Sequence, residues 1–295
     1  MVSICACDAY KDVDNNIIEG KIENCKVIFK GKNSILRVSP GFKAYGCGLV
    51  IIIENSCDIT LGSYFQVGKE STLFFRAGCK VMIGEHASLG NRVNIYCRGI
   101  INIKDYFCMR EYSELRVHGN LTFDSWVYLQ HHVTIYVPRH SELNVGKDTG
   151  FSWYSKVFAG SGHSTFDTKH KIKLEEMVSQ GTEKKRLLIG NHVWVGSGST
   201  IHNEVSIADN SAVVSGSVLY SGHFPDHVMI AGNPAKVVAR NIDWDRRPDI
   251  SYEEFEAYRQ TGKLQIERPS FYDEYIDSGI ADNYYMPDDY YTKNI

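Results

Sequence analysis

Aliphatic residues recur at every sixth position over long stretches of this chain. One ladder consists of Ile189, Val195, Ile201, Ile207 and Val213, and a second of Ile103, Met109, Leu115, Leu121, Val127 and Val133. Such a period directs one side chain of each hexad inward, and three hexads close one coil of about 18 residues. The pattern predicts an all-β protein, a left-handed parallel β-helix.

Further features of the sequence agree with this fold. Shorter ladders begin at Leu61, Ile83 and Val145, and the change of register between Ile101 and Ile103 predicts an insertion at a corner. Small or β-branched residues, which suit a tight corner, follow the first ladder by four positions: Val193, Ser199, Val205, Ser211 and Ser217. The alternative fold, an antiparallel sandwich, predicts a period of two and turns every 8 to 12 residues or so. The combined ladders disfavour it.

The period also divides the chain. Residues 1–50 carry strand-like pieces without a ladder and are interpreted as an irregular cap or opening coil. Residues 51–240 form the β-helix, interrupted at 163–188 by an excursion of mixed charge that breaks the period. Because a loop leaving a rigid scaffold is free of core packing, the excursion is where function is expected.

Residues 241–295 form a short helical and irregular extension. It holds 13 acidic and 6 basic residues together with paired tyrosines. Ser251 and Glu254 have the spacing of a capping box, which predicts a short helix through about Tyr258. The extension either packs over the end of the β-helix or contacts the acceptor or another subunit.

Composition excludes several classes of function. A net charge of −3 without a Lys/Arg-rich run gives no electrostatic basis for binding nucleic acid or an anionic membrane. The sequence shows no signal peptide and no transmembrane segment, so a cytoplasmic location is expected. All eight cysteines lie within the first 108 residues without a CxxC pair. They are interpreted as small buried hydrophobic residues in a reducing compartment, and no metal site is expected.

Three segments carry a resemblance to a known family: SGHSTFD, IGNHVWVGSGSTI and MIAGNPAKVV. In them the chain resembles the hexapeptide-repeat acyltransferases, and among these the O-acetyltransferases of bacterial surface sugars and polysaccharides. The resemblance implies a homotrimer with acetyl-coenzyme A in a cleft between two subunits. Galactoside and maltose acetyltransferases have a shorter excursion than the stretch from His163 to Trp194, so a different acceptor is expected.

His163 is the predicted general base. Acetyl transfer to a sugar hydroxyl requires a proton to be taken from a very weak acid, and imidazole has a suitable pKa. His163 follows Val157 by six positions, in step with the ladder, and the resemblance assigns the base to this histidine. Asp167 is expected to orient the imidazole or to contact the acceptor, although a backbone carbonyl could also orient the ring.

The resemblance places the donor beside Trp194. This residue occupies the last position of its hexad, where a side chain points outward, next to Gly196. It is expected to border the thioester or pantetheine arm, or to lie in a subunit interface. Ser197, Ser215 and Gly216 match family positions that line the coenzyme A slot, where small residues let the pantetheine arm lie flat against the wall.

The segment after the ladder is expected to bind the coenzyme A phosphates. Asn233 and Pro234 form a rigid turn, and Lys236 supplies a positive charge. Sugar acetyltransferases often have a threonine and a lysine just after the ladder, whereas this chain has Tyr220 and Ser221. A phosphate contact is therefore missing at that position.

Gln130 and His132 are candidates for binding the carbohydrate acceptor. They lie about two coils before His163, on the side where the family places acceptor contacts. The adjacent His131 and His132, if on a strand, point to opposite faces, so at most one of them reaches the site.

These features predict a cytoplasmic, homotrimeric, acetyl-coenzyme A-dependent O-acetyltransferase. Its acceptor would be a capsular or lipopolysaccharide glycan, or a sugar precursor, and transfer would be direct in a ternary complex without a metal. The alternatives are an N-acetyltransferase of an amino or nucleotide sugar, a non-catalytic assembly module, and a γ-type carbonic anhydrase. The last would draw zinc ligands from His118, His163, His192 and His202, whose spacing does not suggest convergence.

Overall fold

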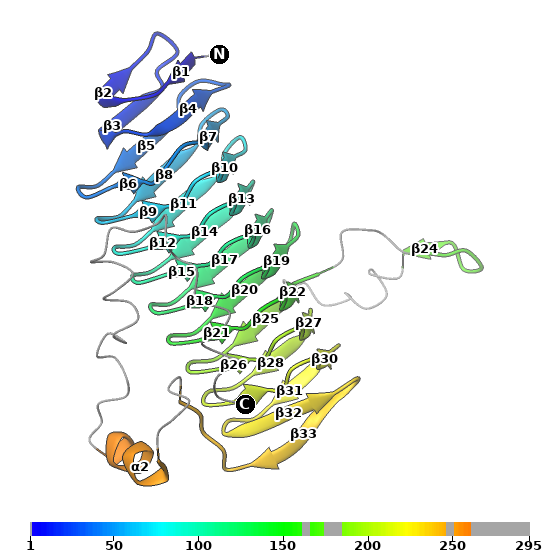
Figure 1. Ribbon diagram of the computed structural model, residues 1–295. Coiled ribbons are helices and arrows are strands. Elements are labelled where there is room, and N and C mark those ends of the chain that lie inside the picture. The colour runs from blue at the N-terminus through cyan, green and yellow to red at the C-terminus, as the bar shows by residue number, and fades with distance from the viewer. Residues whose placement is uncertain (1, 161–165, 174–184, 246–250, 261–295) are drawn as a thin grey trace. The chain divides into compact units, whose positions relative to one another are not determined.

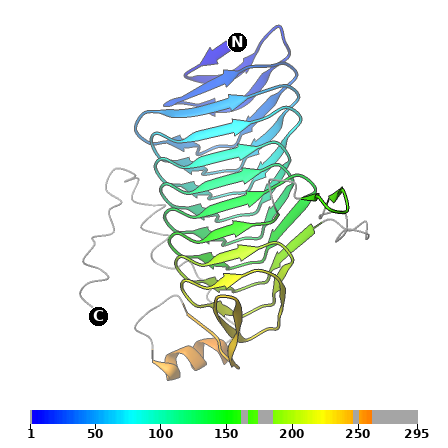
Figure 2. The same ribbon diagram turned by 90° about the vertical axis from the view of Figure 1, so that its right-hand side faces the viewer.

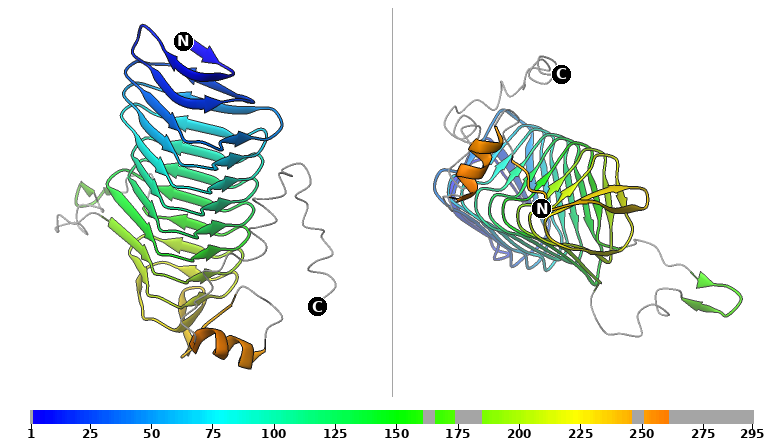
Figure 3. Two further views of the ribbon diagram at one scale, coloured as in Figure 1. Left: turned by 90° about the vertical axis from the view of Figure 1, so that its left-hand side faces the viewer. Right: turned by 90° about the horizontal axis from the view of Figure 1, so that it is seen from below.

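The computed structural model describes residues 2–160, 166–173, 185–245 and 251–260. The chain divides into two compact units, residues 1–243 and 244–295. The first unit is a solenoid whose coils stack directly on one another, with the strands in rows along its sides (Figures 1 and 2). Seen obliquely from below, the coils follow one another around one shared interior (Figure 3, right).

Three sheets, here called A, B and C, form the sides of the solenoid. Sheet A contains, in spatial order, β1 (Val2–Ile4), β4 (Cys25–Phe29), β7 (Leu49–Ile53), β10 (Thr72–Phe75), β13 (Asn94–Cys97), β16 (Glu114–Val117), β19 (Thr134–Val137), β22 (Lys156–Phe158), β27 (Thr200–His202) and β30 (Val218–Leu219).

Sheet B contains β2 (Cys7–Lys11), β3 (Ile17–Ile22), β5 (Ile35–Val38), β8 (Asp58–Leu61), β11 (Lys80–Ile83), β14 (Ile100–Ile103), β17 (Asn120–Phe123), β20 (Ser141–Val145), β25 (Lys185–Ile189), β28 (Val205–Ile207) and β31 (Gly222–Phe224). Sheet C contains β6 (Lys43–Ala44), β9 (Gln66–Val67), β12 (Ser88–Leu89), β15 (Cys108–Met109), β18 (Tyr128–Leu129), β21 (Gly150–Phe151), β26 (Trp194–Val195), β29 (Ala212–Val213), β32 (Val228–Gly232) and β33 (Ala235–Arg240).

The core consists of the predicted ladders. Every residue of the two long ladders is at most 3% exposed, and the corner residues that follow the first ladder by four are buried as well. Burying an aliphatic side chain of this size contributes about 1.5–3 kcal/mol. Buried corner serines bond the backbone through their hydroxyls, as Ser199 does to the Val214 carbonyl (3.1 Å). The ladder prediction is therefore confirmed.

Coil length differs from the prediction of about 18 residues. The paired positions Val50, Thr72, Asn94 and Glu114 lie 22, 22 and 20 residues apart. The spacing of 18 occurs in the later coils, as between Trp194 and Ala212 and between Thr200 and Val218, and near the start of the chain between Ile17 and Ile35. The extra residues lie in the corners. The predicted insertion between Ile101 and Ile103 is wrong, because both are inward residues of the single strand β14.

One column of corners is built from aromatic rings in the left-handed backbone region. Tyr64, His86, Tyr106 and Trp126 have φ angles of 59°, 56°, 60° and 68°. Their rings stack in sequence at centroid distances of 4.8, 5.0 and 4.2 Å. The left-handed conformation costs a residue with a Cβ about 1–2 kcal/mol. Stacking contributes about 0.5–1.5 kcal/mol per aromatic pair and offsets that cost.

Antiparallel strands close both ends of the described solenoid. β1 pairs antiparallel with β4 and β2 with β3, whereas parallel pairing between coils starts with β3–β5 and β4–β7, before residue 50. At the other end β33 pairs antiparallel with β32. Within the predicted excursion, β23 (Phe166–Asp167) and β24 (Ile172–Lys173) form a hairpin, and β25 resumes the coil at Lys185.

The cysteines follow the prediction only in part. Cys25, Cys57, Cys79, Cys97 and Cys108 are buried, as expected of small hydrophobic residues. Two others, at positions 5 and 47, are exposed because they lie in bends between strands and not at inward positions of the coil.

The second unit contains the predicted short helix. α2 spans Tyr252–Gln260 and begins with the capping box, in which Glu254 N–H donates to Ser251 Oγ (3.2 Å) and Ser251 N–H donates to Glu254 Oε2 (2.8 Å). None of the helices in the described ranges is long and apolar enough to cross a membrane.

Candidate functional site

Trp194 lies on the outer face of sheet C, as predicted. Its side chain remains 37% exposed, and its indole N–H donates to Ser152 Oγ (2.8 Å) on the preceding coil. Gly150 is its neighbour in register, and a Cβ there would lie only 2.2 Å from the Tyr128 ring. Tyr128 therefore covers Gly150, and the indole of Trp194 is fixed beside it and partly exposed.

The small residues predicted to line the donor slot meet at one edge of sheet C. Gly196 N–H donates to the Val213 carbonyl, and a Cβ on Gly196 would lie 2.6 Å from Ser215 N. Gly216, with φ of 73°, donates its N–H to the Ser197 carbonyl (2.8 Å). These serines and glycines have a short side chain or none, so little side-chain bulk projects from the sheet next to Trp194.

The hairpin that follows β32 continues this edge. Asn233 and Pro234 form its turn, joined by a cis peptide bond, and Lys236 is exposed on β33. Gly232 N–H donates to Ser217 Oγ (3.2 Å), which fixes the start of the turn to the corner of Ser215 and Gly216. The predicted donor-binding residues therefore lie together, from Trp194 to this hairpin.

The predicted catalytic residues lie in the excursion. His163 falls outside the described residues. Asp167 accepts hydrogen bonds from the backbone N–H groups of Lys169 (2.8 Å) and His170 (2.9 Å), and its other oxygen lies 2.7 Å from His170 Nδ1. The His170 side chain and these N–H groups lower the pKa of Asp167. Both carboxylate oxygens are thus engaged within the β23–β24 hairpin, where Asp167 orients His170.

The two acceptor candidates lie in a corner after β18, not on a strand. Gln130 accepts a hydrogen bond from the indole N–H of Trp153 (3.3 Å). His132 has φ of 59° and stacks between Tyr112 and Tyr154, with centroid distances of 4.9 and 4.7 Å. The expectation that His131 and His132 point to opposite faces of a strand does not apply, because both residues lie in this corner.

A histidine–carboxylate pair beside Gln130 was missed by sequence reasoning. His131 Nδ1 lies 3.1 Å from Glu111 Oε2, and the His131 ring contacts Trp153 edge-on at 6.3 Å. Burial raises the pKa of Glu111, but the contact with His131 and the nearby Arg110 outweigh it, and the net pKa is lowered. A buried carboxylate holding an imidazole is an arrangement that can position a ring for proton transfer.

The sequence would have indicated these residues if the true length of each coil had been known. Glu111, His131 and Trp153 occupy equivalent corners of successive coils and lie 20 and 22 residues apart. With a constant coil of 18 residues they do not align. Once the longer coils are known, the spacing places all three on the edge that also carries Ser152 and Trp194.

The other histidines do not converge. His192 is buried in the corner before β26, with Nδ1 2.6 Å from Asp148 Oδ2 and Nε2 3.4 Å from Asp243 Oδ1. His118 and His202 belong to different coils on sheet A. Within the described ranges, no group of three or more His, Cys, Asp or Glu residues could hold a metal ion.

Comparison with known proteins places these features among acetyltransferases. The chain is 38% identical over 60 residues to galactoside O-acetyltransferase of Escherichia coli strain K12, covering 20% of this chain and 29% of that protein. It is 23% identical over 207 residues to an E. coli K12 protein with the provisional name lipopolysaccharide biosynthesis O-acetyl transferase WbbJ, covering 67% and 91%. The chain spans less than half the length of the first two curated relatives that it matches.

A solved structure shares the fold. The polysialic acid O-acetyltransferase OatWY superimposes with a TM-score of 0.55 and 20% sequence identity, covering 79% of this chain and 98% of that one. No family model matches the chain. The predicted left-handed parallel β-helix is thereby confirmed. In sequence and in fold, the chain resembles the hexapeptide-repeat acyltransferases.

Proposed function

We propose that this protein is an acetyl-coenzyme A-dependent O-acetyltransferase that acts on a carbohydrate hydroxyl. The observation that carries the proposal is the exposed indole of Trp194, fixed by Ser152 at an edge bordered by small residues. Its sequence relatives bear the names of O-acetyltransferases, one of galactosides and one of lipopolysaccharide biosynthesis. The fold is that of an enzyme named for the O-acetylation of polysialic acid.

The edge of sheet C suits an extended thioester carrier. Trp194 offers a flat apolar face at one end, and Ser197, Ser215 and Gly216 leave the wall beside it low. Lys236 gives a positive charge at the other end of this edge, where the carrier's phosphates would lie. The donor therefore lies along the edge with its acetyl group near Trp194.

In the reaction, the hydroxyl oxygen of the acceptor bonds to the acetyl carbon while the carbon–sulfur bond breaks. His163 takes the hydroxyl proton and passes it to the departing thiol, so the histidine is regenerated. Both substrates are bound at once, and transfer is direct. A positioned base of this kind contributes about 10²- to 10⁴-fold to the rate.

The acceptor lies beside Gln130 and the pair of His131 and Glu111. Gln130 and Trp153 give an amide and an aromatic ring on the same edge, since Gln130 lies one coil before Ser152 and Trp153 directly follows Ser152. Amide hydrogen bonds and ring faces are suited to a saccharide, which presents hydroxyls and apolar C–H surfaces. His132, packed between two tyrosines, shapes the floor of this corner.

The enzyme assembles as a homotrimer, as the resemblance implies, and acts in the cytoplasm. Three chains of 33.4 kDa make a particle of about 100 kDa. Sedimentation equilibrium of the full chain measures this mass directly, and a mass of one chain would contradict the assembly. Fractionation of cells that express a tagged copy tests the location.

The test of the proposed reaction is His163→Ala, with His170→Ala as the matched control in the same excursion. Labelled acetyl-coenzyme A and a panel of glycans give the rate of acetyl transfer. We expect His163→Ala to lose at least about 100-fold in kcat, in line with the loss of a general base. We expect His170→Ala to keep most of it, and both variants to bind coenzyme A. Undiminished transfer by His163→Ala would overturn the mechanism.

A further inference from the structure

A hollow of about 460 Å³ lies on the outer face of sheet A, at a distance from the edge of Trp194. It spans β10, β13 and β16, and Phe74, Tyr96, Arg116 and His118 are among the residues that line it. These strands precede every residue predicted to take part in acetyl transfer. The reaction proposed above therefore leaves this hollow unexplained.

The hollow lies beside two short corners between sheets A and B. In these coils only two residues separate paired positions of the two sheets, whereas four residues separate Phe75 from Lys80 in the coil before. The corners are tight because a Cβ on Gly99 would lie 1.9 Å from the Gly119 carbonyl oxygen, and one on Gly119 would lie 2.2 Å from that of Ser141. The shortened corners leave a recess between longer ones.

Arginines surround the recess. Arg116 lines the hollow, and Arg98 neighbours His118 on the preceding coil, because Cys97 pairs with Val117 and the Arg98 N–H donates to the Val117 carbonyl. Burial lowers the pKa of His118, and the charges of Arg98, Arg139, Arg116 and Arg76 lower it further. Arg98 and Arg139 are exposed, and neither forms an ion pair with another described residue.

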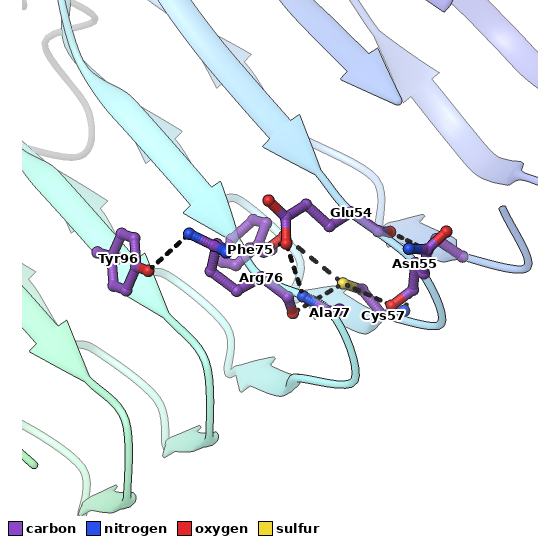
Figure 4. Close-up of polar contacts among 8 residues, drawn as sticks. Glu54, Asn55, Cys57, Phe75, Arg76, Ala77 and Tyr96 are labelled. Carbon is purple, nitrogen blue, oxygen red and sulfur yellow. Dashed lines mark hydrogen bonds and ion pairs between the residues drawn. The ribbon is translucent and has the colours of Figure 1, made fainter. Parts of the chain in front are cut away.

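Two of the arginines are fixed by glutamates. Arg76 Nε lies 2.8 Å from Glu54 Oε2, and its Nη1 donates to the Tyr96 hydroxyl (3.2 Å), so the guanidinium spans three coils (Figure 4). Arg116 Nε lies 2.6 Å from Glu114 Oε1. Four arginines against two glutamates leave an excess of positive charge beside the rings.

A column of rings runs from the hollow along the outer face of sheet A. Its members are in register from coil to coil, with Arg116 in the place of one ring: Phe74, Tyr96, Tyr136, Phe158 and His202. Adjacent strands lie about 4.8 Å apart, so the column offers a ring or a guanidinium plane at each such step. It passes β22, the last strand before the excursion that carries His163.

We propose that the hollow binds a carboxylate-bearing sugar of a polymeric glycan, and that the ring column directs this polymer toward the excursion. The inference rests on the proposed function, because it names the class of acceptor. Arginine forks match the geometry of a carboxylate, and ring faces attract the C–H surfaces of a saccharide. Arg98 and Arg139 form no ion pair with another described residue, so both can bind an anionic group, which a neutral glycan lacks.

Binding of hexagalacturonate to the full chain, without acetyl-coenzyme A, tests this proposal. Maltohexaose is the neutral probe of equal length. The variant Arg98→Gln/Arg139→Gln removes two exposed charges near His118, and Lys43→Gln/Lys104→Gln removes two exposed charges elsewhere, on β6 of sheet C and directly after β14 of sheet B. A third variant, Phe74→Leu, removes a ring while keeping an apolar side chain.

We expect the wild type to bind hexagalacturonate at least tenfold more tightly than maltohexaose, and binding to weaken as salt rises. The arginine variant should lose at least tenfold in affinity, Phe74→Leu about threefold, and the lysine variant less than twofold. Circular dichroism melting confirms that each variant is folded. Equal binding of both probes, or equal loss in both double variants, would overturn the proposal.

Two further results separate this proposal from the others. If acetyl transfer is observed but the arginine variant binds as tightly as the wild type, the hollow is not an acceptor site and the proposed function stands. If the arginine variant loses binding but no acetyl transfer occurs with any glycan, the hollow stands as a glycan site and the proposed function fails. If the arginine variant instead changes the sedimentation mass, the face is a contact between copies, which overturns the proposal.

Discussion

Trp194 shows how a single residue can be fixed without being buried. The hydrogen bond from its indole N–H to Ser152 holds the ring against the coil, yet more than a third of the side chain stays exposed. An apolar ring held open to solvent is expected where a ligand covers it.

Truncation of this ring should therefore weaken donor binding. We expect Trp194→Ala to raise the Kd for coenzyme A at least tenfold, which corresponds to about 1.4 kcal/mol. Trp194→Phe keeps an aromatic face but loses the bond to Ser152, and should have a smaller effect. Titration calorimetry measures both, with Trp126→Phe, a change in a different corner column, as the control. Unchanged coenzyme A affinity in Trp194→Ala would place the donor elsewhere.

The pKa of Glu111 reflects both its burial and its charged neighbours. Glu111 is 7% exposed, and its lowered pKa reflects the contact with His131 and the charge of Arg110, against the opposing effect of burial. Because the folded-state pKa lies below the unfolded value of about 4.5, the ionised carboxylate contributes stability above that pH. This contribution is lost as pH falls through the folded-state pKa.

Glu111→Gln should accordingly destabilise the protein in a manner that depends on pH. We expect a loss of about 1–3 kcal/mol in the free energy of unfolding at pH 7, the range for a buried polar group deprived of its partner. The difference from the wild type should shrink below about pH 4.5. Urea unfolding at pH 7 and pH 4 measures it. Glu114→Gln, which removes a surface pair, should cost less than about 1 kcal/mol at either pH.

At the scale of elements, the cysteines form part of the stacked core. Cys57 and Cys79 occupy equivalent positions of successive coils, and the Cys57 thiol contacts the carbonyls of Phe75 and Arg76. The hydrogen bond with Cys79 and burial raise the pKa of Cys57, and burial raises the pKa of Cys25 to about 12. Thiolate, the reactive form, is thus disfavoured at both positions.

Alkylation should distinguish these thiols from the exposed ones. With iodoacetamide at pH 8, we expect rapid modification of Cys5 and Cys47, and protection of Cys25, Cys57 and Cys79. Peptide mass spectrometry reads the pattern, and in urea all eight cysteines should react. Early modification of Cys57 in the native protein would show that the coils open there.

Regular elements could be predicted from the sequence because they repeat, while the corners could not. An inward ladder residue such as Val195 or Leu115 meets the same surroundings in every coil, so the period of six reveals it. The corners between sheets A and B vary in length, with four residues between Phe75 and Lys80 but two between Cys97 and Ile100, so a fixed period does not locate them.

In the candidate site, too, residues at regular strand positions could be predicted from the sequence, whereas residues in the corners could not. Trp194 and the small residues beside it lie in regular hexads, and the structure brings them together at one edge. His131 and Glu111 lie in corners of longer coils, where a constant spacing misaligns them. The role of Asp167 also depended on local geometry, because a short turn gave its carboxylate backbone N–H groups and His170 as partners.

In the first unit as a whole, stacking aligns residues that lie one coil apart in the sequence into columns along the solenoid. A residue at a given place in one coil lies against its equivalent in the next, so a ring or a charge repeated at coil spacing becomes a continuous strip. The edge of sheet C that carries Trp194 and the ring column on sheet A are two such strips. A polymeric acceptor fits this architecture because it can contact several coils at once.

A stack also has two open ends, which in this solenoid are covered by antiparallel strands. An uncovered strand edge offers unpaired N–H and C=O groups and promotes association between chains. β1 and β2 cover β4 and β3, and β2 carries a register shift between Cys7 and Ala9. At the other end β33 places Lys236 and Arg240 on the outermost strand, where charge discourages further pairing.

Removal of residues 1–11 should therefore cause association without unfolding the coils. The deletion exposes the edges of β3 and β4, whereas the parallel pairs β3–β5 and β4–β7 remain. We expect far-ultraviolet circular dichroism to keep its β signature while light scattering reports particles larger than those of the full chain. Changing Lys26 of β4 to Val should increase the particle size further, because it removes a charge next to the exposed edge. A truncated chain of unchanged particle size would mean that β3 and β4 do not need cover, since the twist of the first coil or its own charges would suffice to block pairing.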